Sequence, residues 1–186
     1  MIQVLGLIPA RAGSKRLPGK NTRLFAGRPL ISWTILTAMQ SPWLDAVAVT
    51  SDSQEILDIA VEGGAVAIKR PWALAHDTSL VYGSILHALS LISARYVCLL
   101  QPTSPLRITE DIDGCIAKCG DEKACVSVEI GRNAPNGAVY VGREDWLRSG
   151  GNFDAPGILQ YEMPPERSID INTLEEFEAA ERLVKA

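Results

Sequence analysis

The feature that most constrains this chain is a basic loop that follows its first apolar run. Residues 4–8 form an apolar segment of the length expected for a buried strand. The loop after it, up to Asn21, contains two glycines, two prolines and the cations Arg11, Lys15, Arg16 and Lys20. Glycine lets backbone N–H groups approach a ligand closely, and the cations carry the charge that a polyphosphate requires. The pattern therefore predicts an anion-binding loop at the end of a strand.

The loop differs from the P-loop of ATPases. Five residues rather than four separate Gly13 from Gly19, and Lys20 is followed by Asn21 instead of the Ser or Thr that would bind Mg²⁺. A P-loop ATPase is therefore disfavoured. The alternative of a solvated basic turn is also disfavoured, because ordinary turns do not concentrate so many special residues after a first strand.

Composition limits the class of protein. The 186 residues, of which 47% are hydrophobic and 22% charged, predict one domain over 1–186 with a core of ordinary size. A net charge of −4 and a pI near 5.2 argue against a nucleic-acid-binding protein with a general basic field. The basic loop is thus expected to act locally, on a small anion.

Targeting signals and cysteine spacing add two further expectations. The sequence shows neither a leader pattern nor an apolar stretch of membrane-spanning length, which predicts a soluble cytoplasmic protein without membrane contact. The four cysteines form no C-x-x-C pair. Although Cys115 and Cys119 would share a helix face, buried reduced thiols are favoured over a zinc site.

Strand and helix patterns alternate along the chain, which predicts an α/β fold. Strands are expected over 4–8, 46–50, 65–68, 96–100, 124–129 and 138–141, and a short apolar run covers 158–161. Helices are expected over 30–40, from the cap residues 51–53 to 62, after the cap residues 77–79, over 110–118, and after a capping box formed by Thr173 and Glu176.

Polar residues gather where the predicted strands end. Gln101 follows the most apolar strand, and two prolines should hold its turn at the same sheet edge as the basic loop, where ligands of open α/β sheets lie. Asp52 also follows a strand, but capping of the next helix is the favoured interpretation. Arg70 closes a third strand, either as a ligand-binding residue or as a surface arginine.

Five collinear segments resemble the CMP-sugar synthetases, the acylneuraminate cytidylyltransferases. They are residues 10–21, Arg70-Pro71, 99–107, 136–141 and 168–173. The resemblance implies a Rossmann-like, three-layer nucleotidyltransferase fold with a mostly parallel sheet. It also implies transfer of CMP from CTP to a carboxylated sugar, a nonulosonic acid such as an acylneuraminate, with release of pyrophosphate.

The resemblance also implies a role for each site residue. Arg11 and Lys20 would act on the α-phosphate and its transition state, and Ser14, Lys15 and Arg16 would hold the β- and γ-phosphates. Ala10, Gly13, Asn21 and Arg70 would contact the nucleotide, and Gln101 the acceptor sugar. A competing interpretation is that Gln101 satisfies nearby backbone groups.

Magnesium is the implied cofactor, with Asp170 and Asn172 as its ligands. Alternate residues of an extended segment point to one side, as the paired aspartates of the relatives would. Because Asn172 is neutral, Mg²⁺ should bind more weakly than at a site with two aspartates. Alternatively, Asp170 merely ends a strand. The related Kdo-activating enzymes carry Gly-Asp-Glu-Pro where this chain has Pro-Thr-Ser-Pro at 102–105, which places the resemblance in the nonulosonate branch.

One departure from the relatives leaves alternatives open. Only residues 130–135 stand where the sialic acid enzymes carry an extended segment that supplies dimer contacts and part of the sugar pocket. A smaller acid or a phosphonate is therefore an alternative acceptor, and a catalytically impaired nucleotide-binding module that needs a partner is an alternative function. The same departure predicts a monomer or an atypical homodimer.

Overall fold

The computed structural model describes residues 2–14, 16–71 and 81–185 of the chain. Its strands are β1 (Ile2–Pro9), β2 (Leu24–Phe25), β3 (Arg28–Pro29), β4 (Ala46–Ser51), β5 (Val66–Lys69), β6 (Ala94–Leu100), β7 (Ala124–Glu129), β8 (Pro135–Arg143) and β9 (Leu159–Met163). Its helices are α1 (Leu30–Met39), α2 (Gln54–Glu62), α3 (Val81–Leu91), α4 (Thr109–Cys119), α5 (Glu144–Arg148), the 3₁₀ helix η2 (Pro165–Arg167) and α6 (Leu174–Lys185).

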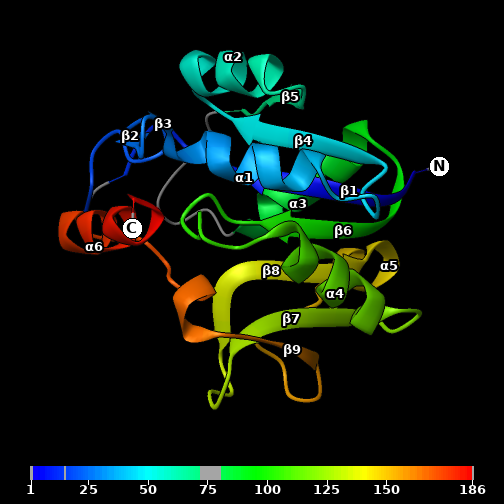
Figure 1. Cartoon of the computed structure of the whole chain (residues 1–186). Coiled ribbons are helices and arrows are strands. Elements are labelled where there is room, and N and C mark those ends of the chain that lie inside the picture. The colour runs from blue at the N-terminus through cyan, green and yellow to red at the C-terminus, as the bar shows by residue number, and fades with distance from the viewer. Residues whose placement is uncertain (1, 15, 72–80, 186) are drawn as a thin grey trace.

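Seven strands form one central sheet in the order β5-β4-β1-β6-β8-β7-β9. Every neighbouring pair is parallel except the two pairs made by β8, which runs against both β6 and β7 (Figure 1). The prediction of an α/β fold with a mostly parallel sheet is therefore confirmed. The parallel strands β1, β4 and β6 end side by side, so the loops that follow them meet at one edge.

Helices cover both faces of the sheet, because alternate residues of each strand point in opposite directions. In β1, Val4 and Ile8 pack in a core cluster with α1, α2 and α4, whereas Leu5 and Leu7 pack with α3 and α5 on the other face. The three-layer arrangement that the resemblance implied is thus present (Figure 1).

A third apolar cluster attaches α6 beside the start of α1. Leu17 and Phe25 pack there with Ile171 and Phe177, and the rings of Phe25 and Phe177 meet edge to face at 5.3 Å. The predicted capping box is confirmed, since the Glu176 carboxylate accepts the Thr173 N–H at 2.8 Å and the Thr173 hydroxyl accepts the Glu176 N–H at 3.2 Å. This cluster carries the C-terminal segment back to the basic loop.

The structure corrects one local expectation and shows local features that the sequence did not predict. The N-cap of α2 is Ser53, whose hydroxyl accepts the Ile56 N–H, so the capping role favoured for Asp52 is wrong. Before the Asp170 segment, Pro164 is extended and Pro165 begins η2. The hairpin of β2 and β3 was not expected. The predicted helix start at 77–79 lies outside the described residues.

The packing of Gly63 gives a first testable prediction. A Cβ at this position would lie 2.7 Å from Cγ2 of Ile35, which is 1% exposed in the core. Overpacking of this kind costs about 1–3 kcal/mol, so Gly63→Ala should lower the thermal midpoint by roughly 2–10 °C. Leucine lacks the offending Cβ methyl, and Gly63→Ala/Ile35→Leu should recover part of the loss. A midpoint of Gly63→Ala at or above that of the wild type would contradict this packing.

Candidate active site

The basic loop begins where β1 ends and turns back sharply at Gly19. Gly19 has φ +66°, a left-handed conformation that favours glycine. The turn is closed by hydrogen bonds from the Lys20 N–H to the Leu17 carbonyl and from the Thr22 and Arg23 N–H groups to the Gly19 carbonyl. As a result Lys20 is directed inward and is 9% exposed, while Gly13 and Arg16 remain exposed.

Lys20 faces the segment that carries Asp170. Its Nζ donates to the Ile171 carbonyl at 2.7 Å. Burial lowers the pKa of Lys20 below that of an ordinary lysine, and Arg16 and Arg11 lower it further, while Asp170 acts against them. The ammonium group is thus held within the electric field of the Asp170 carboxylate.

Arg70 and Asp52 support the base of the loop. The Arg70 guanidinium donates to the Ala10 carbonyl at 3.2 Å and to the Ser84 hydroxyl at 2.7 Å, and it lies 3.8 Å from Asp52. Burial lowers the pKa of Arg70, which is only 6% exposed, so the alternative of a surface arginine is wrong. Arg11 lowers the pKa of Arg70 as well, which places its charge near this pair.

Further hydrogen bonds hold the loop in place. Asp52 accepts the Ala12 N–H at 3.0 Å, a contact that the sequence did not reveal because the two residues are 40 positions apart. The Asn21 side chain donates to the Arg11 carbonyl at 3.1 Å, and the backbone carbonyl of Asn21 accepts the Ile31 N–H at 3.0 Å. Asn21 therefore stabilises the conformation of the loop. Ser14 is half-buried, and Lys15 lies outside the described residues.

Gln101 and Asp170 line one cavity of about 320 Å³ at the same sheet edge. Its other walls come from β7, β8 and the short connection between them, and include Glu129, Arg132 and Tyr140. Burial raises the pKa of Tyr140 to about 12, so its hydroxyl stays protonated at neutral pH. The structure thus brings the predicted acceptor residue and the predicted metal ligand together, and adds lining residues that the sequence analysis had not selected.

Arg107 is a structural residue of the site, and the sequence alone did not predict its role. It is 2% exposed and donates to the carbonyls of Ser104, Ala138 and Gln101 and to the Thr34 hydroxyl. Burial lowers its pKa to about 10, so it remains charged at neutral pH. One cation therefore joins the Gln101 turn to α1 and β8.

The segment before Asp170 is fixed at two points. Arg167 donates two hydrogen bonds, at 2.9 and 3.0 Å, to Asp111, a fully buried carboxylate at the start of α4. Asn136 donates to the Ser168 hydroxyl at 2.9 Å. These contacts join β8, α4 and the C-terminal segment, and so determine where Asp170 lies.

The donor set at Asp170 suits a hard cation. Its Oδ1 is buried and has no hydrogen-bond partner within the described ranges. Mg²⁺ binds such oxygens and commonly uses one or two carboxylates together with phosphate and water. No three His, Cys, Asp or Glu side chains cluster to form a metal site in residues 2–14, 16–71 and 81–185. The four cysteines are buried and unpaired by disulfides.

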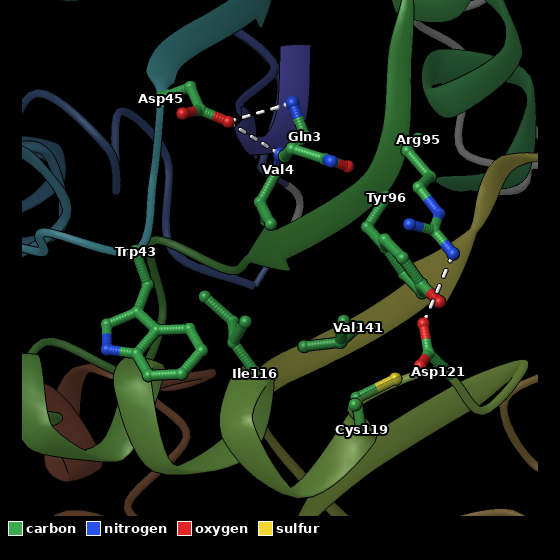
Figure 2. Close-up of a pocket in the computed structure, with 11 residues that line it drawn as sticks. Gln3, Val4, Trp43, Asp45, Arg95, Tyr96, Ile116, Cys119, Asp121 and Val141 are labelled. Atoms are coloured by element: carbon green, nitrogen blue, oxygen red, sulfur yellow. Dashed lines mark hydrogen bonds and ion pairs between the residues drawn. The ribbon is translucent and has the colours of Figure 1, made fainter.

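A second cavity, of about 270 Å³, lies at the opposite edge of the sheet, near the amino ends of β1 and β6. Figure 2 shows Trp43 and Tyr96 among its lining residues, and an ion pair between Arg95 and Asp121 at 3.1 Å. None of the predicted site residues lines it. In the part of the chain that the structure describes, we find no helix long and apolar enough to cross a membrane.

A basic loop and a carboxylate that face each other where parallel strands end are the arrangement expected of an α/β protein that binds an anionic ligand. A family model described as cytidylyltransferase matches residues 5–137. The chain belongs to this cytidylyltransferase family.

Curated relatives and solved structures agree with this assignment. The chain is 43% identical over 120 residues to the CMP-N,N'-diacetyllegionaminic acid synthase of Legionella pneumophila, covering 60% of this chain and 50% of that protein. It is 30% identical over 214 residues to the N-acylneuraminate cytidylyltransferase of Escherichia coli O18:K1:H7, covering 96% and 51%. The chain therefore spans about half the length of these relatives. The second match is longer than the 186-residue chain, so that relative carries residues without a counterpart here.

Two solved structures share the fold. A CMP:2-keto-3-deoxy-manno-octonic acid synthetase complexed with CTP has a TM-score of 0.81 at 16% identity and covers 98% of each chain. A cytidylyltransferase from Leptospira borgpetersenii has a TM-score of 0.78 at 19% identity, covering 100% of this chain and 87% of its own. At these identities, the likeness shows the fold alone.

Proposed function

We propose that this chain transfers CMP from CTP to a carboxylated sugar of the nonulosonic acid class and releases pyrophosphate. The observation that carries the proposal is the pairing of Lys20 with the Asp170 segment at the edge where Gln101 lines the neighbouring cavity. The relatives support the acceptor class, since they include a CMP-N,N'-diacetyllegionaminic acid synthase, an N-acylneuraminate cytidylyltransferase and a pseudaminic acid cytidylyltransferase.

The acceptor hydroxyl attacks the α-phosphorus and loses its proton. The bond between the α-phosphorus and the oxygen of the β-phosphate breaks, so that pyrophosphate leaves. Negative charge grows on the phosphoryl oxygens and on the leaving pyrophosphate, so cations placed in advance lower the barrier. Arg11 and Lys20 would stabilise the α-phosphate, and Ser14, Lys15 and Arg16 the outer phosphates. Gln101 would orient the acceptor.

Mg²⁺ dependence is part of the proposal. A bound Mg²⁺ would neutralise phosphate charge and polarise the phosphoryl group. The buried, unpartnered Oδ1 of Asp170 is the observation that supports a cation here.

A smaller acidic acceptor, including a phosphonate or a short keto acid derivative, is the second candidate. Two observations favour it. The connection between β7 and β8 is short, and the cavity of about 320 Å³ lies at the lower end of the 300–1,000 Å³ range of ligand pockets. The short connection also supports a monomer or an atypical homodimer.

A nucleotide and acceptor screen with Mg²⁺ present tests these candidates. We expect pyrophosphate release with CTP and a nonulosonic acid, and much less with ATP or GTP. Turnover with small acids alone would replace the first candidate by the second. CTP binding by calorimetry without release from any acceptor would identify a catalytically impaired nucleotide-binding module. Equal binding of ATP, GTP and CTP would contradict the proposal.

A further inference from the structure

The side chain of Asn172 joins two parts of the site that lie 156 positions apart. Its Oδ1 accepts a hydrogen bond from Arg16 at 2.8 Å, and its Nδ2 donates to Oδ2 of Asp170 at 2.7 Å. A guanidinium only donates and a carboxylate only accepts, so these two partners determine the orientation of the amide. The oxygen that could bind a cation is therefore the one turned towards Arg16.

The backbone around Asn172 is held independently of this side chain. The Ile171 carbonyl accepts from Lys20, and the Ile171 N–H donates to the Thr103 carbonyl at 2.7 Å. The Asn172 N–H donates to the Glu176 carboxylate at 2.7 Å. A substitution of the Asn172 side chain thus removes the connection to Arg16 while the segment stays anchored.

An amide at position 172 interacts with the Asp170 carboxylate differently from a carboxylate at the same position. Two carboxylates at hydrogen-bond distance repel each other unless a cation or proton lies between them. Asn172 instead donates to one oxygen of Asp170, so these two side chains attract each other and require no cation between them. The other oxygen, Oδ1, is the buried one that lacks a hydrogen-bond partner among the described residues.

We infer that Asn172 is a positioning residue and not a metal ligand: it connects the Arg16 loop to Asp170 and leaves Asp170 as the residue of this segment that binds the cation. The identity of the cation rests on the proposed function. The inference replaces the expectation that Asn172 and Asp170 both bind Mg²⁺. It predicts that the Arg16–Asn172 hydrogen bond and the bound cation coexist, whereas a ligand role for the Asn172 oxygen would require that bond to break.

A double-mutant cycle on thermal unfolding tests the inference without CTP or acceptor. The four proteins are the wild type, Arg16→Gln, Asn172→Ala and the double variant, each measured with and without saturating Mn²⁺. Each single change should lower the midpoint by about 1–4 °C, and the double variant should lose no more than the larger single loss. This non-additivity of the two changes should persist in Mn²⁺.

Asp170→Asn is the reference variant for cation binding. Mn²⁺ should raise the midpoints of the wild type and of Asn172→Ala to a similar extent and leave that of Asp170→Asn unchanged. Additive effects of the two single changes without the cation would overturn the connection. If the effects of the two changes became additive in Mn²⁺, Asn172 would be a ligand of the cation. If Mn²⁺ did not raise the midpoint of the wild type, the assignment of a cation to Asp170 would be wrong.

Kinetics separate positioning from general loss of structure. In Asn172→Ala the KM for CTP should rise several-fold, because the loop that carries Arg16 is released, while kcat at saturating Mg²⁺ stays within about threefold of the wild type. A lower kcat with an unchanged KM would overturn the inference. If no acceptor supports turnover, the proposed function fails, but the thermal cycle still decides this inference.

Discussion

Replacing Lys20 with methionine is expected to lower the rate of CMP transfer by about 10²–10³-fold, the usual cost of removing one preorganised group that stabilises transition-state charge. Lys20 is 9% exposed and its ammonium lies beside the Asp170 segment. Methionine has nearly the same length and packs in the same space. Because the Ile171 carbonyl loses its donor, the thermal midpoint should fall by roughly 2–10 °C. Steady-state pyrophosphate release measures the much larger loss of rate.

Lys118→Met is the matched control. Lys118 lies in the last turn of α4, and none of the contacts of the site involves it. The same chemical change there should leave the rate within about twofold of the wild type. A Lys20→Met variant that retained more than a tenth of the wild-type rate would show that Lys20 does not stabilise the transition state.

The pH dependence of kcat/KM gives a second measure of Lys20. Its folded pKa is lowered from 10.5 by burial, so the free enzyme loses this charge at a lower pH than an ordinary lysine does. The rate should therefore fall on the alkaline side, beginning below pH 10.5. In the unfolded chain Lys20 binds its proton more tightly, so between the two pKa values this group makes stability rise with pH. Between these two pKa values, activity should therefore fall as the pH rises, while the contribution of Lys20 to stability increases.

Replacing Arg107 with methionine should destabilise the fold by about 3–5 kcal/mol, because buried carbonyls of three residues and a hydroxyl lose their donor. Removal of a buried cation recovers some desolvation free energy, but hydrogen bonds to charged groups contribute about 1.5–3 kcal/mol each and outweigh it. The thermal midpoint should fall by roughly 10 °C, as calorimetry would show.

Arg107→Lys separates charge from geometry. A lysine keeps the cation but reaches fewer of the four acceptors, so its midpoint should lie between those of the wild type and Arg107→Met. Because Gln101 is held through its carbonyl, the KM for the acceptor should rise more than the KM for CTP. A midpoint of Arg107→Met equal to that of the wild type would contradict the structural role of Arg107.

Much of the fold and part of the site could be predicted from the sequence, because their signals are local. The alternation of apolar residues in β1 and the Thr173–Glu176 capping box both act within a few residues. The position of Lys20 after a glycine turn, and of Gln101 after the most apolar strand, likewise follow from short patterns combined with the rule that parallel strands end at one edge.

Contacts between distant residues could not be predicted in this way. Asp52 has the side chain of a helix cap and follows a strand, but its partners are the Ala12 N–H and Arg70. Nothing within the motif around Arg107 indicates that its partners include Thr34 and Ala138. Such roles depend on which elements pack together, and many packings are compatible with the same local preferences.

By itself, the sequence determined the class of this protein: an α/β fold with a mostly parallel sheet and a basic, glycine-containing loop after its first strand. Only the tertiary structure decided how the loop meets the C-terminal segment, with Lys20 on the Ile171 carbonyl and Arg16 on Asn172. The physical reason is the range of the forces. Backbone preferences and side-chain periodicity act over a few neighbouring residues, whereas a hydrogen bond between residues 156 positions apart exists only once the sheet and α6 have brought them together.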